Sequence, residues 1–222
     1  MKALIIEDMN KAVIRDVPVR ELEPDEILCR VSYCGICGTD IAIYTGETNF
    51  VRDGLIKYPV RIGHEWSGVV AATGNAVTKF KPGDRVVSDN GITCRKCEAC
   101  KRGDLAHCES IKSVGTINCW DGGFAEYIII PEIHLFHLPD SIDDRNAATI
   151  EPLTVSYAGI TKREITPETI VAVIGTGPIA LGIVALAKTM GAGRIIAVGR
   201  TDSKLQRCLE AGATDIVNNT RV

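Results

Sequence analysis

Residues 170–180 read IVAVIGTGPIA, and this stretch decides the fold of the C-terminal part of the chain. The continuous apolar run at 170–174 is typical of a strand that is buried on both faces of a parallel sheet. Two glycines follow the run, and Pro178 then suits the first turn of a helix. The stretch therefore predicts a strand, a tight glycine turn and a helix over residues 178–190.

The same alternation continues beyond this helix. Residues 194–198 predict a second buried strand, 202–211 a second helix, and 214–217 the start of a third strand. Strands that alternate with helices in this way indicate a parallel sheet. Because such a sheet normally has both faces covered and continues further, we expect the chain to lack the C-terminal part of this domain.

The glycine turn has the spacing G-x-G-x-x-A of a dinucleotide-binding fingerprint. Gly175 permits the tight turn, Gly177 lets the backbone approach a pyrophosphate, and a small third residue lets the helix pack closely on the strand. The phosphates then lie at the helix N-terminus, where free N–H groups favour anions. A plain tight turn is the alternative. The residues predicted to contact the cofactor here are Gly175, Gly177, Pro178, Ile179 and Ala180.

The end of the second strand predicts which dinucleotide binds. NAD enzymes of this fold place an acid there to bind the ribose 2′-hydroxyl, whereas this chain has Gly199 and Arg200. A guanidinium can pair with a 2′-phosphate through two hydrogen bonds. We therefore favour NADP over NAD. In the alternative, Arg200 is a solvated loop residue and Asp202 binds the ribose.

The first part of the chain predicts a β-rich unit. Ile27, Cys29, Val31 and Tyr33 alternate with more polar neighbours, as in a half-buried strand. Other short strand candidates are separated by Gly- and Pro-containing turns, which favours a barrel or sandwich. We place the two domains at residues 1–152 and 153–222.

Composition excludes several classes of function. The net charge of −3 argues against a nucleic-acid binder or an anionic-membrane protein. An acid at position 7 interrupts any secretory signal, and no apolar stretch is long enough to span a bilayer. An odd count of nine cysteines argues against a disulfide scaffold. We expect a cytoplasmic protein whose cysteines serve metal or redox chemistry.

Four cysteines with the spacing C-x2-C-x2-C-x7-C predict a structural zinc site. Four thiolates in one loop close a tetrahedral Zn²⁺ shell and leave no position for substrate. An iron–sulfur cluster also uses four cysteines, but the bacterial spacing ends in C-x3-C-P. The ligands are Cys94, Cys97, Cys100 and Cys108.

A second cluster combines residue types found at catalytic zinc. Cys34 and Cys37 form a C-x-x-C pair, which is either a redox pair or one metal ligand beside a packed thiol. Residues 63–65 read Gly-His-Glu, and Glu151 offers a further carboxylate. One Cys, one His64 imidazole and one Glu would give three protein ligands and an open fourth position.

Taken together and in order, these residues resemble the zinc-dependent medium-chain alcohol and polyol dehydrogenases. The matching motifs are CGICGTD at 34–40, GHE at 63–65, GDRV at 83–86, the four-cysteine loop, GGFAEY at 122–127, EPL at 151–153 and GTG at 175–177. The resemblance covers essentially the whole chain. It implies an α/β plus β fold: a GroES-like β-rich catalytic domain, followed by the first half of a Rossmann doubly wound parallel sheet.

The resemblance also implies roles for particular residues. Cys37 and His64 match the ligands of the catalytic zinc, and Glu65 matches a carboxylate that binds the metal or stands just behind it. Glu151 stands where alcohol dehydrogenases of the liver and yeast type have a cysteine. A glutamate at this position resembles the sorbitol/L-iditol, threonine and glucose dehydrogenase branches. Thr39 matches the hydroxyl that passes on the substrate proton.

Two further residues bear on this assignment. Asp40 matches an acid that orients the imidazole of His64. Ala42 replaces a histidine that continues the proton relay in many relatives, so a ribose hydroxyl or water would take over that step.

The implied activity is hydride transfer between a secondary alcohol of the polyol or sugar type and NADP or NAD, with two zinc ions per chain. The implied partner is a small alcohol, without nucleic acid or membrane, and complete relatives are homo-oligomeric. The competing hypotheses are a truncated zinc-stabilised module with little or no turnover and a zinc-ribbon nucleic-acid binder.

Overall fold

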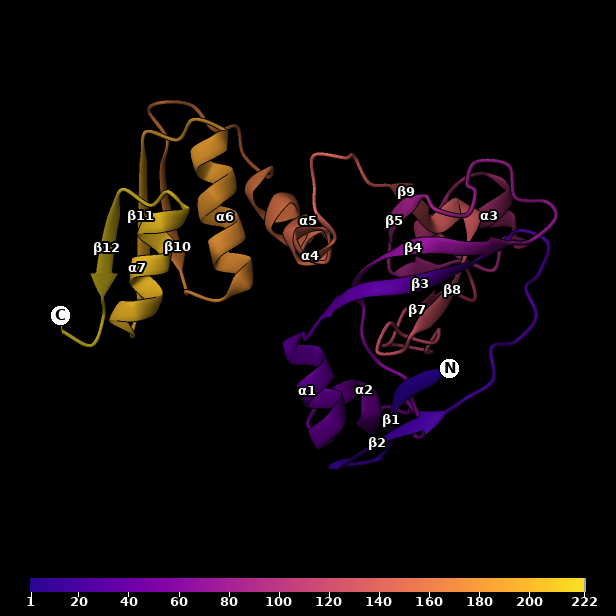
Figure 1. Ribbon diagram of the computed structural model, residues 1–222. Coiled ribbons are helices and arrows are strands. Elements are labelled where there is room, and N and C mark those ends of the chain that lie inside the picture. The colour runs from indigo at the N-terminus through magenta and orange to yellow at the C-terminus, as the bar shows by residue number, and fades with distance from the viewer. Residues whose placement is uncertain (222) are drawn as a thin grey trace. The chain divides into compact units, whose positions relative to one another are not determined.

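The computed structural model describes residues 1–221, which fall into two compact units, Met1–Thr149 and a second unit that begins at Ile150 (Figure 1). Each unit encloses a hydrophobic core of its own. The domain boundary that we placed between residues 152 and 153 stays a prediction.

An antiparallel sheet of five strands forms the centre of the first unit. In spatial order the strands are β8 (Tyr127–Pro131), β3 (Glu26–Gly35), β4 (Glu65–Thr73), β5 (Arg85–Ser88) and β9 (Leu135–His137). Apolar side chains from these strands, such as Ile27, Val86 and Ile128, are fully buried in one core. The expected β-rich unit is therefore confirmed.

Shorter elements complete the first unit. They are the hairpin β1 (Lys2–Asp8) and β2 (Lys11–Asp16), the helices α1 (Gly38–Thr45), α2 (Asn49–Arg52), α3 (Glu98–Lys101) and α4 (Asp144–Ala147), the short strands β6 (Gly91–Ile92) and β7 (Lys112–Ser113), and the 3-10 turns η1 (Leu105–His107) and η2 (Glu132–His134). A second core cluster lies where β1 and α1 meet, around Ile6 and Ile43.

One detail of the predicted alternation in β3 was wrong. Ile27 and Cys29 are fully buried as expected, but the side chain of Tyr33 is 50% exposed. The pairing of β3 with β4 shifts register between Val31 and Tyr33. Since one extra residue moves every later side chain to the other face, the period-2 pattern fails beyond the shift.

The second unit is the predicted parallel sheet with its helices. Strands β10 (Ile170–Ile174), β11 (Arg194–Gly199) and β12 (Asp215–Asn218) pair in parallel in that order. Helices α6 (Pro178–Thr189) and α7 (Asp202–Ala211) connect them, and α5 (Ile150–Ile160) precedes them. Among the described residues, no helix has the length and apolar character needed to cross a membrane.

Both connecting helices pack on the same side of this sheet. The strand order advances in one direction, and right-handed crossovers then place successive helices on one face. Accordingly, α6 contacts both α7 and α5. Gly182 permits the approach of α5, because a Cβ at this position would lie 2.5 Å from Oγ of Ser156.

Candidate metal centres and cofactor site

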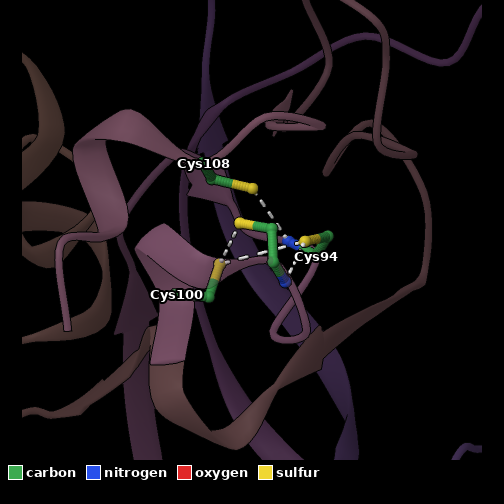
Figure 2. A group of neighbouring side chains, drawn as sticks. Cys94, Cys100 and Cys108 are labelled. Carbon is green, nitrogen blue, oxygen red and sulfur yellow. Dashed lines mark hydrogen bonds between the residues drawn. The ribbon is translucent and has the colours of Figure 1, made fainter. Parts of the chain in front are cut away.

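The four predicted zinc-binding cysteines come together around α3, and Figure 2 labels three of them, Cys94, Cys100 and Cys108. Their sulfur atoms all lie within 4.8 Å of one another. Sγ of Cys100 is 3.5 Å from Sγ of Cys97 and 3.9 Å from Sγ of Cys94. Sulfur ligands 2.3 Å from a tetrahedral zinc ion would be separated by about 3.8 Å. The cluster therefore fits a four-thiolate zinc site.

Backbone N–H groups around this loop favour negatively charged sulfur. The amide of Cys97 donates to Sγ of Cys94 at 3.3 Å, and the amide of Cys94 donates to Sγ of Cys108 at 3.2 Å. Amide donors at Lys96 and Cys97 lower the pKa of the Cys94 thiol to about 6. Desolvation and sulfur neighbours raise the pKa of the Cys100 thiol to about 11. A divalent cation would allow all four sulfurs to be thiolates.

A second cluster unites Cys37, His64 and Glu65, whose ligand atoms also lie within 4.8 Å of one another. Cys37 is the N-cap of α1. Glu65 opens β4 opposite Gly35, the last residue of β3. The antiparallel pairing thus brings the C-x-x-C segment to the Gly-His-Glu segment.

Asp40 connects the two segments that carry these ligands. Its carboxylate is buried, and it accepts hydrogen bonds from the amide of Cys37 at 2.8 Å and from the amide of Gly63 at 3.2 Å. Nδ1 of His64 lies 3.6 Å from Oδ1 of Asp40, which is an ionic contact longer than a hydrogen bond. Asp40 therefore fixes the backbone of both segments as well as facing the imidazole.

The charges around His64 favour a cation. Burial lowers the pKa of His64, but the facing Asp40 and Cys37 outweigh it and raise that pKa to about 9. Nδ1 of His64 is buried and has no hydrogen-bond partner among the described residues. A soft thiolate, an imidazole and a carboxylate form a donor set that suits zinc. The residues present fit a zinc ion with an open coordination position.

The structure bears on the two alternatives for the C-x-x-C pair. Cys34 lies in β3, and burial raises the pKa of its thiol to about 12. A reactive redox cysteine needs the opposite shift, toward the thiolate. Of the two readings, the geometry supports one ligand, Cys37, beside one packed thiol, Cys34.

Two glycines that sequence reasoning had not weighed make room for this cluster. A Cβ at Gly35 would lie 2.4 Å from Oε2 of Glu65, so only glycine leaves space for that carboxylate. Gly63 has φ +96°, and a Cβ there would meet the backbone of Phe124. The signal was present in the motifs CGICG and GHE, but its meaning depends on tertiary contacts.

The structure gives the positions of two other predicted site residues, Thr39 and Glu151. Thr39 lies half-buried in the first turn of α1, two residues after Cys37. Glu151 lies in the first turn of α5, in the second unit. Their roles stay predictions.

The glycine turn between β10 and α6 has the geometry of an anion site. Gly175 has φ +127°, a conformation that L side chains rarely adopt. Gly177 is the N-cap of α6, and a Cβ there would meet nothing within 4 Å. No side chain caps the helix, so its first N–H groups remain available. A cavity of about 400 Å³ adjoins the turn, lined by residues that include Pro178, Ile179 and Ala180.

The end of β11 lies beside this turn. A Cβ at Gly199 would lie 2.5 Å from Cγ2 of Thr176, so glycine permits the close approach. Arg200 is exposed and forms no ion pair among the described residues. Asp202 already accepts a hydrogen bond from Nδ2 of Asn218 at 2.6 Å and pairs with Arg221.

Comparison with known proteins identifies relatives of both units. Residues 23–140 match the family model described as the alcohol dehydrogenase GroES-like domain. The sorbitol dehydrogenase of Bacillus subtilis is 36% identical over 218 residues, which are 98% of this chain and 61% of that protein. The chain thus spans about three fifths of the length of this curated relative.

Solved structures also match the whole chain. A candidate zinc-binding dehydrogenase of Sinorhizobium meliloti, solved with NADP, is 34% identical with a TM-score of 0.88. A short chain alcohol dehydrogenase of Escherichia coli, solved with NADH, is 32% identical with a TM-score of 0.87. Each match covers 100% of this chain, and 62% and 63% of those chains respectively. These matches confirm the predicted combination of a GroES-like domain with the start of a dinucleotide-binding sheet.

Proposed function

The chain belongs to the alcohol dehydrogenase family that carries the GroES-like domain, and from this premise we propose that it serves hydride transfer between a secondary alcohol and NADP. The observation that carries the proposal is the cluster of Cys37, His64 and Glu65, which matches an open zinc site in its donor set. The relative named sorbitol dehydrogenase supports a polyol or sugar substrate.

Zinc held at this cluster would lower the pKa of a coordinated alcohol hydroxyl, and the nicotinamide would accept the hydride. The protein contributes position and proton transfer. Asp40 holds the segments of Cys37 and His64 in register. Thr39, in the first turn of α1, is proposed to accept the hydroxyl proton of the substrate. Alanine at position 42 cannot pass this proton on, so it leaves through water or a ribose hydroxyl.

We further propose the ligand assignment and the domain boundary that the sequence predicted. Two zinc ions bind per chain: one at the four cysteines, the other at Cys37 and His64 with Glu65 or Glu151 as the carboxylate. The catalytic domain spans 1–152 and the dinucleotide-binding domain 153–222. The proposed partner is a small alcohol substrate, with neither nucleic acid nor membrane as a partner.

Ligand binding tests the function without depending on turnover. Protein loaded with Co²⁺ in place of zinc should change its visible spectrum when sorbitol or xylitol is added, because the hydroxyl enters the open coordination position. Ethanol should cause a smaller change at the same concentration. If polyols leave the visible spectrum unchanged while added imidazole changes it, the proposed substrate class is contradicted.

The proposed preference for NADP predicts an effect of Arg200→Gln. Loss of the guanidinium should weaken NADPH binding by about tenfold or more and leave NADH binding unchanged, since charge-assisted hydrogen bonds to phosphate contribute about 1.5–3 kcal/mol. Quenching or enhancement of reduced nicotinamide fluorescence measures both affinities. Arg163→Gln, another exposed arginine of the second unit, is the matched control. An equal loss of affinity for NADPH and NADH would show that Arg200 does not bind the 2′-phosphate.

A further inference from the structure

A cavity of about 370 Å³ in the first unit combines cationic and apolar walls. Arg20, Arg61 and Lys112 line it, together with one carboxylate, that of Asp121. Leu28 of β3 and Ile129 of β8 contribute to the apolar side. The volume falls in the range of sites that hold small organic ligands. None of these residues belongs to the metal clusters or to the glycine turn.

Trp120 brings two of these cations together. Cζ of Arg20 lies 5.8 Å from the centroid of the indole ring, and Nζ of Lys112 lies 5.9 Å from it. The indole Nε1 donates to the backbone oxygen of Ile129 at 2.6 Å, which fixes the ring against β8. The ring therefore holds both positive groups at the cavity wall.

Arg61 supplies an unused donor on a buried charge. Its side chain is only 8% exposed, and its Nε has no hydrogen-bond partner among the described residues. Burial lowers the pKa of Arg61. The negative charge of Asp121 partly offsets this decrease in pKa, and the positive charge of Arg20 adds to it. The ion pair with Asp121 spans 3.3 Å, and that carboxylate is 71% exposed to water. A buried cationic donor that is left unpaired calls for a partner with oxygen acceptors.

The other two cations differ in whether an acidic side chain already pairs with them. Arg20 is committed to the buried Glu26, with contacts of 2.5 Å and 2.9 Å from its two terminal nitrogens. Lys112, the first residue of β7, is exposed and has no ion pair among the described residues. With Arg20 paired to Glu26 and Arg61 to Asp121, the ammonium of Lys112 remains as unpaired positive charge at the cavity, beside the free Nε donor of Arg61.

We infer that this cavity binds a phosphate monoester of a small organic molecule. The phosphate oxygens accept hydrogen bonds from Arg61 and Lys112, and the organic part packs on the apolar wall around Leu28. Arginine suits this role because its planar donors match phosphate geometry. The site is separate from the dinucleotide phosphates, which belong to the glycine turn of the second unit.

Tryptophan fluorescence provides the test. Of the two tryptophans, Trp66 is buried and hydrogen-bonded to Ser88, whereas Trp120 lines the cavity. Phenyl phosphate, titrated at constant ionic strength, should change the emission saturably, and Trp120→Phe should abolish that change. Phenyl phosphate should bind at least about tenfold more tightly than inorganic phosphate, because it also buries its ring.

Charge-removing variants locate the binding site. Lys112→Gln, an exposed substitution, should weaken phenyl phosphate binding by about tenfold, and Arg61→Met should weaken it further. Lys57→Gln removes an exposed lysine elsewhere and should bind like the unmodified protein. Equal affinity for the ester and inorganic phosphate, unchanged affinity in Lys112→Gln, or the absence of a saturable change would each overturn the assignment.

Discussion

Replacement of Cys97 by serine is expected to remove about one zinc ion per chain and to unfold the loop around α3. Zinc at four thiolates contributes about 10–16 kcal/mol in small zinc domains. The loop holds only short elements, β6, α3, η1 and β7, so its order depends on the metal. Elemental analysis measures the zinc, and limited proteolysis measures the exposure of the loop between β6 and β7.

Cys208→Ala is the matched control for this variant. Cys208 is a fully buried thiol packed in the core of the second unit, and neither metal cluster of the described residues includes it. Its loss should leave the zinc content unchanged and lower the free energy of unfolding by about 1 kcal/mol. If Cys97→Ser kept the full zinc content, the four-cysteine site would be refuted.

The second large effect is expected for Cys37→Ala. This variant should also lose about one zinc ion per chain while the four-cysteine loop keeps its own. Loss of a residue that binds the metal directly should lower the affinity for zinc by more than about 10–100-fold, the loss typical for residues that only hydrogen-bond to a ligand. In the cobalt-loaded protein, the spectral response to sorbitol should disappear as well.

Cys34→Ala is the control from the same C-x-x-C motif. Its thiol belongs to neither metal cluster of the described residues, and burial keeps its pKa near 12. The variant should retain both zinc ions and the response to polyol. A parallel loss of zinc in Cys34→Ala and Cys37→Ala would instead favour a site built on both thiols.

Local sequence patterns predicted those elements and sites whose defining residues lie close together in the sequence. The run 170–174, the glycine turn and the helix after it were recognised because each depends on residues adjacent in sequence. The four-cysteine cluster was recognised for the same reason, since three of its ligands lie within seven residues. The start of α6 at Pro178 and the end of α7 before Gly212 both agree with the structure.

Features that join distant segments could not be predicted in this way. Tyr33 was placed on the wrong face because its register depends on the partner strand β4. The cavity around Trp120 draws its cations from positions 20, 61 and 112, and no local period links them. Gly35 has its role only because Glu65 lies opposite it across the sheet.

The carboxylate of Asp40 has a consequence for the kinetics of metal exchange. Two backbone amides and an imidazole converge on this one buried anion, which connects α1 to the Gly63–His64 segment in the folded protein. The conformational entropy of aligning these ligands is therefore lost when the domain folds, and not when the ion arrives. Metal release should then follow the breaking of coordination bonds, with no prior opening of the protein around Cys37 and His64.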